Sequence, residues 1–273
     1  METTKITLEE TLNNLLLNEI IENFRVLDYT TGERLPIKLR DYQIEILQSM
    51  INNKFVSVNA CRQSGKSIIA KIYALFCFFK NKTVLYHGPN QGACDNFIRD
   101  ILGFLNTVSK EGIFVKKSKT ITGKNHEEWL EFSKSLLKNR IKTSSGKNLL
   151  NRGMSWDNII IDEAAYCKIE RQLFDEVIPV CTARKNDKLV LLSTPNGFNY
   201  FSAIHNGENN FVKHDVYYYD VDKFNSEEWK DQMIKNSGEE KFNQEFRLLF
   251  NAHTHSYPRV DGGPIPPKSP CSA

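Results

Sequence analysis

Short runs of apolar and β-branched residues alternate along the chain with longer stretches in which apolar residues recur every three or four positions. The short runs are typical of buried parallel strands, and the periodic stretches are typical of helices that pack on a sheet. Strands are predicted at residues 55–58, 83–87, 158–161 and 188–192. Helices are predicted at residues 40–52, 68–79, 91–108 and 169–183. This alternation predicts an α/β fold with a mostly parallel sheet flanked by helices.

Other segments depart from this alternation. Residues 25–39 contain Thr31-Gly32 and Pro36 and predict an extended, turn-rich connection. Weak alternation between residues 129 and 144 predicts a hairpin at the edge of the sheet. Before the connection, apolar residues at helical spacing predict an amphipathic helix that serves as a packing surface. Its apolar stripe comprises Leu8, Leu12, Leu15, Leu16 and Ile20.

Composition adds the class of protein. With 273 residues, 40% of them hydrophobic and 25% charged, the chain can bury one sizeable core and a small appendage. No apolar run approaches the length needed to cross a bilayer, so we expect a cytoplasmic enzyme that does not bind membranes. The six cysteines form no C-x-x-C pair and are expected to be reduced and buried. They are Cys61, Cys77, Cys94, Cys167, Cys181 and Cys271.

The net charge of +3 does not by itself identify a polyanionic partner, but basic residues cluster in one part of the chain. Either a solvated charged face or a nucleic-acid-binding surface explains this cluster, and the sequence leaves both open. Its members are Lys116, Lys117, Lys119, Lys124, Lys134, Lys138, Arg140, Lys142 and Lys147.

A phosphate-binding loop follows the first predicted strand, with the sequence Ala60-Cys61-Arg62-Gln63-Ser64-Gly65-Lys66-Ser67. In such a loop, backbone N–H groups and the start of the next helix surround an anion. Lys66 would reach the β- and γ-phosphates of ATP, and the Ser67 hydroxyl would bind Mg²⁺. Ala60 replaces the usual first glycine of this motif. A G-K-S tripeptide can also occur by chance in a loop that binds no nucleotide. The flanking strand and helix favour the nucleotide site.

A second motif predicts hydrolysis as well as binding. The run Asn158-Ile159-Ile160-Ile161 ends in Asp162 and Glu163, as expected of a buried strand that delivers carboxylates to the edge of a sheet. Asp162 would hold Mg²⁺ through water, and Glu163 would act as general base on the attacking water. The alternative is a core strand that ends in two solvated acids.

Two weaker signals accompany these motifs. Ser193, Thr194 and Asn196 end the strand at 188–192 and could sense the γ-phosphate, although turn chemistry explains them equally well. The Gln43 amide could pair with the adenine edge while Tyr42 stacks on the base. An ordinary helix start with a packed tyrosine explains this pair as well.

Taken together, the segments resemble the ATPase domain of the large terminase subunit, the motor that packages DNA into tailed-phage procapsids. The resemblance covers roughly residues 39–250, and Arg62 within the loop favours terminases over related helicases. It rests on Tyr42-Gln43, Arg62 to Ser67, Val84 to Pro89 with Gln91 and Ala93, Arg152-Gly153, Asp162 to Ala164, Ser193 to Gly197, and Phe242 to Phe246.

This resemblance implies a P-loop ATPase of the additional-strand type with a small lid subdomain. The implied organisation is an N-terminal helix and extended connection at 1–38, the ATPase core at 39–210, the lid at 211–250 and a proline-rich tail at 251–273. The implied ligands are ATP and Mg²⁺. The implied partners are double-stranded DNA, the small terminase subunit, the portal protein and further copies of the chain in a ring.

The resemblance also suggests a mechanism. Positive charge must meet the charge that develops on the transferred phosphoryl group, from Arg62 in the same chain and from Arg152 of a ring neighbour. Hydrolysis would change the segment from Ser193 to Asn196, tilt the lid against DNA and advance the duplex.

The tail departs from the family pattern. Residues 251–273 contain five prolines and no apolar periodicity, so no packed domain is expected there. We therefore expect no nuclease domain and no nuclease activity, and His253 and His255 are expected to be inert. Two alternatives stay open: a superfamily 2 helicase-like DNA translocase, and a truncated prophage remnant that binds nucleotide without turnover.

Overall fold

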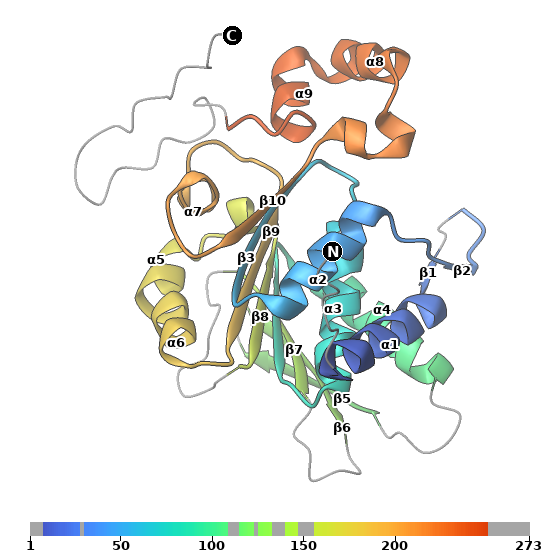
Figure 1. The fold of residues 1–273 in the computed structure, drawn as a ribbon, viewed down its shortest axis with the longest axis vertical. Coiled ribbons are helices and arrows are strands. Elements are labelled where there is room, and N and C mark those ends of the chain that lie inside the picture. Colours follow the sequence, from blue (N-terminus) through green and yellow to red (C-terminus); the bar gives the residue numbers. More distant parts are fainter. Residues whose placement is uncertain are drawn as a thin grey trace, which may run out of the picture.

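The computed structural model describes residues 8–27, 30–108, 115–122, 125–132, 140–146 and 156–250. Its centre is an eight-stranded sheet with the strand order β10-β3-β9-β8-β4-β7-β6-β5 (Figure 1). The strands are β3 (Phe55–Ala60), β4 (Val84–Gly88), β5 (Val115–Thr122), β6 (Asn125–Phe132), β7 (Arg140–Ser145), β8 (Asn158–Asp162), β9 (Lys188–Ser193) and β10 (Val212–Val216).

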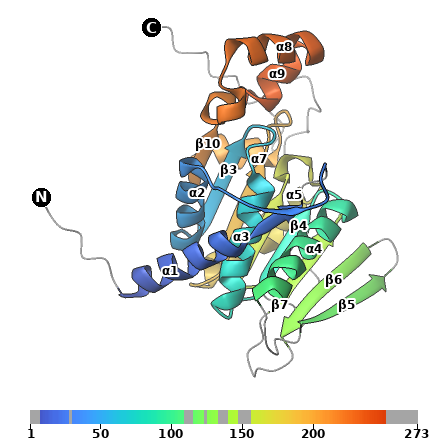
Figure 2. The same ribbon diagram turned by 90° about the vertical axis from the view of Figure 1, so that its right-hand side faces the viewer.

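The strands from β10 to β7 in this order run parallel, and only β6 and β5 run antiparallel to their neighbours. This arrangement confirms the predicted mostly parallel sheet, and the β6–β7 pair confirms the hairpin predicted at its edge. The hairpin does not form the edge itself, because β5, a further strand from a lysine-rich stretch, pairs with β6 and is the edge strand (Figure 2).

Helices cover both faces of the sheet (Figures 1 and 2). One face is covered by α1 (Leu8–Asn23), α2 (Asp41–Asn52), α3 (Lys66–Phe79) and α4 (Gln91–Val108), and the other by α5 (Glu170–Gln172), the π-helical segment η2 (Leu173–Val177), α6 (Ile178–Ala183) and α7 (Tyr200–Asn206). Side chains of a strand point alternately to its two faces, so each strand serves both layers. On β8, Ile160 packs with the first group of helices, whereas Ile159 and Ile161 pack with the second.

Helix α1 forms as predicted, but its buried stripe differs from the expected one. Leu12 and Leu15 are exposed, at 54% and 60%. Ile20 is buried as predicted, but Leu17 and Phe24, the residue after the helix, are buried in place of Leu12 and Leu15, and α1 packs against α3. Leu17, Ile20 and Phe24 also follow helical spacing, so the sequence allowed two stripes, and contact with α3 selects the second.

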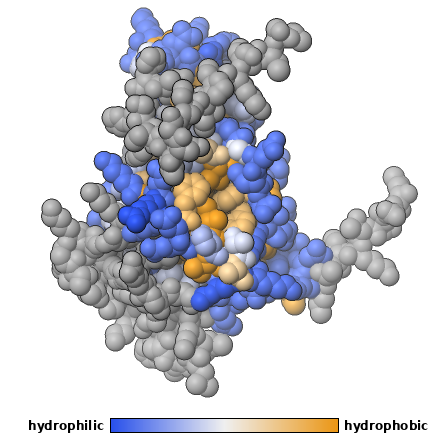
Figure 3. Space-filling view, turned by 90° about the vertical axis from the view of Figure 1, so that its left-hand side faces the viewer, coloured by the Kyte–Doolittle hydropathy of each residue, from blue (hydrophilic) through white to orange (hydrophobic). Residues whose placement is uncertain are grey.

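A short two-stranded sheet follows α1, formed by β1 (Arg25–Leu27) and β2 (Arg34–Pro36). It lies in the segment predicted to be extended. On the opposite side of the molecule, the surface over α5 to α7 carries a hydrophobic area framed by polar residues (Figure 3). Phe174 on η2 and Val180 on α6 are among the exposed apolar residues of that layer.

The part that follows β10 forms a small aromatic-cored unit, residues 217–250, which we call the lid from here on. It contains η3 (Tyr218–Asp220), η4 (Asp222–Phe224), α8 (Glu227–Ser237) and α9 (Glu239–Glu245). Trp229 lies at its centre, with ring centroids 4.4 Å from Phe224 and 5.2 Å from Phe246. Strand β10 itself pairs with β3 in the central sheet. The predicted domain limits stay a prediction.

Three further expectations concern single residue types. Cys61, Cys77, Cys94, Cys167 and Cys181 are free and buried, as predicted, and Cys271 lies outside the described residues. Lys142 is buried on β7, so it is part neither of a solvated charged face nor of a nucleic-acid-binding surface. The other side chains of the basic cluster lie outside the described part of the chain. No described helix has both the length and the apolar character that a membrane span requires.

Candidate nucleotide-binding site

The loop between β3 and α3 has the backbone shape of an anion site. Gly65 adopts a left-handed conformation, with φ of 90°, immediately before α3 begins at Lys66. A Cβ atom at Gly65 would lie 2.3 Å from Gln43 Nε2, so another residue would strain the backbone and displace the Gln43 amide from the loop. No side chain caps this helix start. Its first N–H groups therefore point toward the space where an anion would bind.

Lys66 lies between the two predicted motifs. Its buried ammonium group donates to the carbonyl oxygens of Ala60 and Cys61, at 3.0 and 3.2 Å, and lies 4.0 Å from Glu163 Oε1. The Ser64 hydroxyl is buried nearby in the loop and has no hydrogen-bond partner among the described residues. An unpaired hydroxyl and a buried ammonium group beside the loop are features that a bound phosphate group would complete.

The acid strand delivers Asp162 next to the loop. Ser67 donates from its hydroxyl to Asp162 Oδ2 at 2.9 Å, although 95 positions separate the two residues. The Tyr86 hydroxyl donates to the same oxygen at 2.8 Å, and the Glu163 N–H donates to Oδ1 at 3.1 Å. Hydroxyl and carboxylate oxygens are the ligands that Mg²⁺ prefers. The donor set of Ser67 and Asp162 therefore fits the predicted metal site.

Glu163 is held by the end of the neighbouring strand. It has a left-handed backbone conformation, with φ of 51°, which turns the chain sharply after β8. Its Oε2 accepts a hydrogen bond from the Thr194 hydroxyl at 3.1 Å and one from the Thr194 N–H at 3.4 Å. The Ser193 hydroxyl accepts from the Ala165 N–H, and the Asn196 amide donates to the Ala165 carbonyl. The predicted coupling segment thus contacts the predicted base directly.

Tyr42 and Gln43 both contact the phosphate loop. The Tyr42 hydroxyl and the Gln43 amide donate to the Ser64 carbonyl, at 2.8 and 3.0 Å. Gln43 Oε1 also accepts from the Arg40 N–H at 2.9 Å. These bonds give the pair a role in holding the loop that the sequence did not indicate. A glutamine amide has four hydrogen-bonding positions, so adenine recognition by Gln43 stays a prediction.

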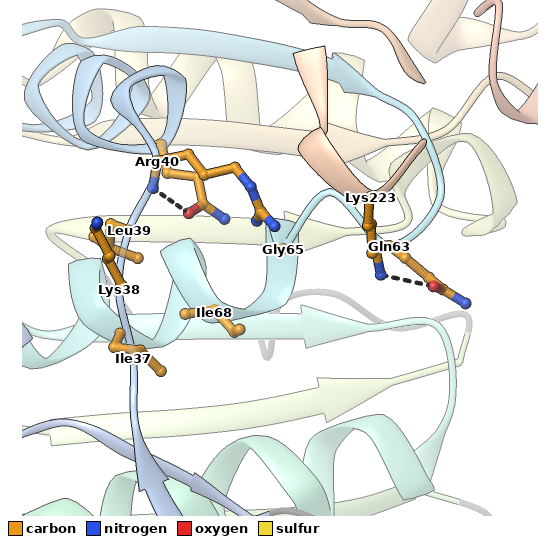
Figure 4. Close-up of a pocket in the computed structure, with 9 residues that line it drawn as sticks. Ile37, Lys38, Leu39, Arg40, Gln63, Gly65, Ile68 and Lys223 are labelled. Atoms are coloured by element: carbon orange, nitrogen blue, oxygen red, sulfur yellow. Dashed lines mark hydrogen bonds between the residues drawn. The ribbon is translucent and has the colours of Figure 1, made fainter. Parts of the chain in front are cut away.

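A cavity of about 250 Å³ lies beside this loop (Figure 4). Lys223 reaches into it from the lid and donates to Gln63 Oε1 at 2.9 Å. Its lining therefore combines the segment before α2, the phosphate loop, the start of α3 and the lid. The lining residues are Ile37, Lys38, Leu39, Arg40, Gln43, Gln63, Gly65, Ile68 and Lys223.

The lid contacts the site at two further points. The Arg62 guanidinium forms an ion pair with Glu245 of α9 at 2.9 Å, and the Arg62 N–H donates to the Glu245 carbonyl. The buried Gln244 amide donates to the Pro195 carbonyl at 2.9 Å. In this structure Arg62 therefore contacts the lid. Arg152, the predicted trans-acting arginine, lies outside the described residues.

Burial shifts the pKa values of several groups around the site. It raises the pKa of Cys61 to about 11, so the thiol in the loop stays protonated at neutral pH. Burial, followed by the charge of Asp162, raises the pKa of the Tyr86 hydroxyl well above its usual value. Burial lowers the pKa of His87 to about 4, so this imidazole is neutral at pH 7.

The structure brings together all predicted site residues except Arg152. It also adds residues to which sequence reasoning assigned no role: Tyr86, Lys223, Gln244 and Glu245. Three of these lie in the lid, and two of the three, Lys223 and Glu245, are more than 150 positions from the loop residues that they contact. No local pattern indicates such a contact. Tyr86 and the α9 segment lie within motifs that carried the family resemblance.

The strand ends of this parallel sheet carry a phosphate loop, a carboxylate beside the loop serine and a second acid. Together these features define a P-loop nucleotide-binding protein. The sequence matches the family "Terminase large subunit, T4likevirus-type, N-terminal" over residues 58–261. The chain therefore belongs to this family of phage DNA-packaging ATPase domains, which confirms the predicted resemblance and sets the helicase alternative aside.

Solved structures of large terminases share the fold. The ATPase domain from Thermus phage P74-26 is 18% identical, with a TM-score of 0.57 over 78% of this chain and 94% of that chain. The large terminase of bacteriophage HK97 is 17% identical, with a TM-score of 0.58 over 87% of this chain and 54% of that chain. This chain thus spans about half the length of the HK97 protein.

Proposed function

We propose that this chain is a Mg²⁺-dependent ATPase that drives double-stranded DNA into a procapsid. The observation that carries the proposal is the convergence of the two motifs: Ser67 bonds to Asp162, and Lys66 lies 4.0 Å from Glu163. The large terminase of another thermophilic bacteriophage binds ADP and ATP-γ-S, which supports ATP as the nucleotide for this fold family.

Each group has a chemical role in this proposal. The loop N–H groups and Lys66 bind the β- and γ-phosphates, and Ser67 with Asp162 holds Mg²⁺, which neutralises phosphate charge. Glu163 accepts a proton from the attacking water, and Thr194 orients its carboxylate through the contact at 3.1 Å. Arg62 supplies positive charge to the phosphoryl group once it leaves Glu245.

The lid supplies the proposed route from hydrolysis to DNA movement. Thr194 contacts Glu163, and the adjacent Pro195 accepts a hydrogen bond from Gln244 of α9. A change in charge at Glu163 would alter these contacts and release or tighten the lid. A motor of this kind acts on the duplex as a ring of copies, together with the small terminase subunit and the portal.

Two variants test the chemistry of the site. Lys66→Ala should weaken ATP binding and abolish turnover, because it removes the charge that meets the phosphates. Glu163→Gln should still bind ATP but lose at least about 10²-fold in turnover, because an amide cannot accept the proton. Equilibrium binding of a fluorescent ATP analogue and phosphate release, with and without duplex DNA, measure both effects. Hydrolysis by Glu163→Gln at the wild-type rate would disprove the assignment of the base. ATP binding without any turnover by the wild type would favour the inactive remnant.

A mixing experiment tests the proposed trans-acting arginine. Arg152→Ala should bind ATP normally and hydrolyse it about 10³-fold more slowly, because the arginine meets charge that develops only in the transition state. Lys66→Ala protein still carries Arg152, so a mixture of the two inactive variants should regain part of the activity. A mixture that stays inactive would exclude action between neighbouring subunits.

A further inference from the structure

The buried hydroxyl of Tyr86 touches the proposed metal-binding acid from the side opposite the nucleotide loop. Tyr86 lies on β4, the neighbour of β8 in the sheet, and its hydroxyl donates to Asp162 Oδ2 at 2.8 Å. Its side chain is 1% exposed, and Asp162 is 3% exposed. We propose that Tyr86 is a positioning residue that holds the Asp162 carboxylate in its metal-binding orientation. This inference rests on the proposed Mg²⁺-dependent function.

The hydrogen bonds of Asp162 show why one tyrosine can matter. Its Oδ2 has two donors, the hydroxyls of Ser67 and Tyr86, and Oδ1 accepts from the Glu163 N–H at 3.1 Å. Ser67 is exposed, and its hydroxyl would also serve the metal, so its bond to Asp162 depends on the state of the site. Tyr86 is buried and has no proposed role as a metal ligand, so its hydroxyl does not have to leave Asp162 when the metal binds.

The aromatic ring that carries this hydroxyl is itself held in place. It stacks on Phe97 of α4, with ring centroids 3.8 Å apart and an interplanar angle of 14°. The ring is also part of the buried core on that face of the sheet. Close packing of the ring restricts its movement, so the position of its hydroxyl helps to fix the orientation of the carboxylate.

Groups that orient a metal ligand typically change metal affinity 10- to 100-fold when they are removed. Tyr86→Phe keeps the ring and its stacking but removes the donor to Asp162. We expect about a tenfold increase in the Mg²⁺ concentration needed for half-maximal binding of a fluorescent, non-hydrolysable ATP analogue. At saturating Mg²⁺ the affinity for the analogue should stay within about twofold of the wild type, since Tyr86 does not contact the nucleotide loop.

The chain offers a matched control at the other end of β8, the strand that carries Asp162. The Tyr73 hydroxyl on α3 donates to Asn158 Oδ1 at 2.8 Å, and Tyr73 is also 1% exposed. Tyr73→Phe therefore removes the same group from a bond of the same length to β8, far from the metal site. It should lower the melting temperature about as much as Tyr86→Phe does, but leave the Mg²⁺ dependence unchanged.

The outcomes separate this inference from the proposed function. If wild-type binding depends on Mg²⁺ and the curve of Tyr86→Phe coincides with it, the inference is wrong and the proposed function stands. The inference also fails if Tyr73→Phe shifts the curve equally. Wild-type binding that is indifferent to Mg²⁺ would overturn both. If Tyr86→Phe does not fold, Phe97→Leu offers a second test, because it removes the ring that stacks on Tyr86 but keeps the hydroxyl. It should raise the Mg²⁺ concentration for half-maximal binding by a smaller factor, and an unchanged Mg²⁺ concentration would overturn the inference.

Discussion

The contact between Thr194 and Glu163 provides the sharpest test of how the site activates water. Thr194 is 5% exposed, and its hydroxyl donates to Glu163 Oε2 at 3.1 Å. Thr194→Val keeps the branched shape and removes the hydroxyl, which also forms a side-chain hydrogen bond with Tyr166. A hydrogen bond to a charged group is worth roughly 1.5–3 kcal/mol. The Glu163 side chain is 33% exposed, so we take the lower end. A loss of about 1.4 kcal/mol corresponds to a tenfold decrease in kcat.

The assay is phosphate release at saturating ATP, with KM measured in parallel. KM should change by less than about twofold, because the hydroxyl orients the base and does not bind the nucleotide. Thr143→Val is the control: Thr143 is fully buried on β7, and its hydroxyl has no partner among the described residues. That variant should hydrolyse ATP at the wild-type rate. Wild-type kcat for Thr194→Val, or equal losses in both variants, would refute the proposed orientation of Glu163.

Three further predictions follow from contacts around the site. Gln43→Ala should reduce the preference for ATP over GTP by about fivefold, since one neutral hydrogen bond is worth about 1 kcal/mol. An unchanged ratio of the dissociation constants for ATP and GTP would exclude adenine recognition by Gln43. Burial lowers the pKa of His87 from 6.5 to about 4. Between these two pH values the imidazole is therefore protonated in the unfolded chain but neutral in the folded chain. As the pH falls from 7.5 to 5, the contribution of His87 should lower the free energy of unfolding by about 2 kcal/mol. Urea denaturation should show that the free energy of unfolding of His87→Gln depends less on pH than that of the wild type; the same pH dependence in both proteins would contradict this. Gln244→Ala removes the lid's donor to Pro195 and should abolish stimulation of turnover by duplex DNA while basal turnover stays within about twofold; stimulation equal to that of the wild type would exclude this route to the lid.

The sequence predicted the central part of the fold because local signals there are strong. Buried parallel strands need continuous apolar runs, and β3, β4 and β8 show them plainly. The phosphate loop and the acid pair follow two of these strands, so the parallel order alone places both at the same edge of the sheet. The family resemblance then predicted which residues meet there.

Other features depend on contacts that no local pattern contains. Strand β5 has a lysine-rich sequence and forms through its pairing with β6. The predicted stripe of α1 includes Leu12 and Leu15 as well as Ile20, but packing against α3 and α4 buries Leu17 and Phe24 together with Ile20. The ion pair between Arg62 and Glu245 joins residues 183 positions apart. In each case tertiary contact, and not propensity, determines which residues are buried or paired.

The order of the strands explains how two adjacent acids can have different proposed tasks. Strand β8 lies between β4 and β9, and each neighbour supplies a hydroxyl to one acid: Tyr86 from β4 to Asp162, and Thr194 after β9 to Glu163. The two hydroxyls therefore orient the acids from opposite sides of the strand. If Tyr86 serves the metal ligand and Thr194 the base, their variants separate the two steps. One variant changes the Mg²⁺ requirement for binding, and the other changes turnover once nucleotide and metal are bound.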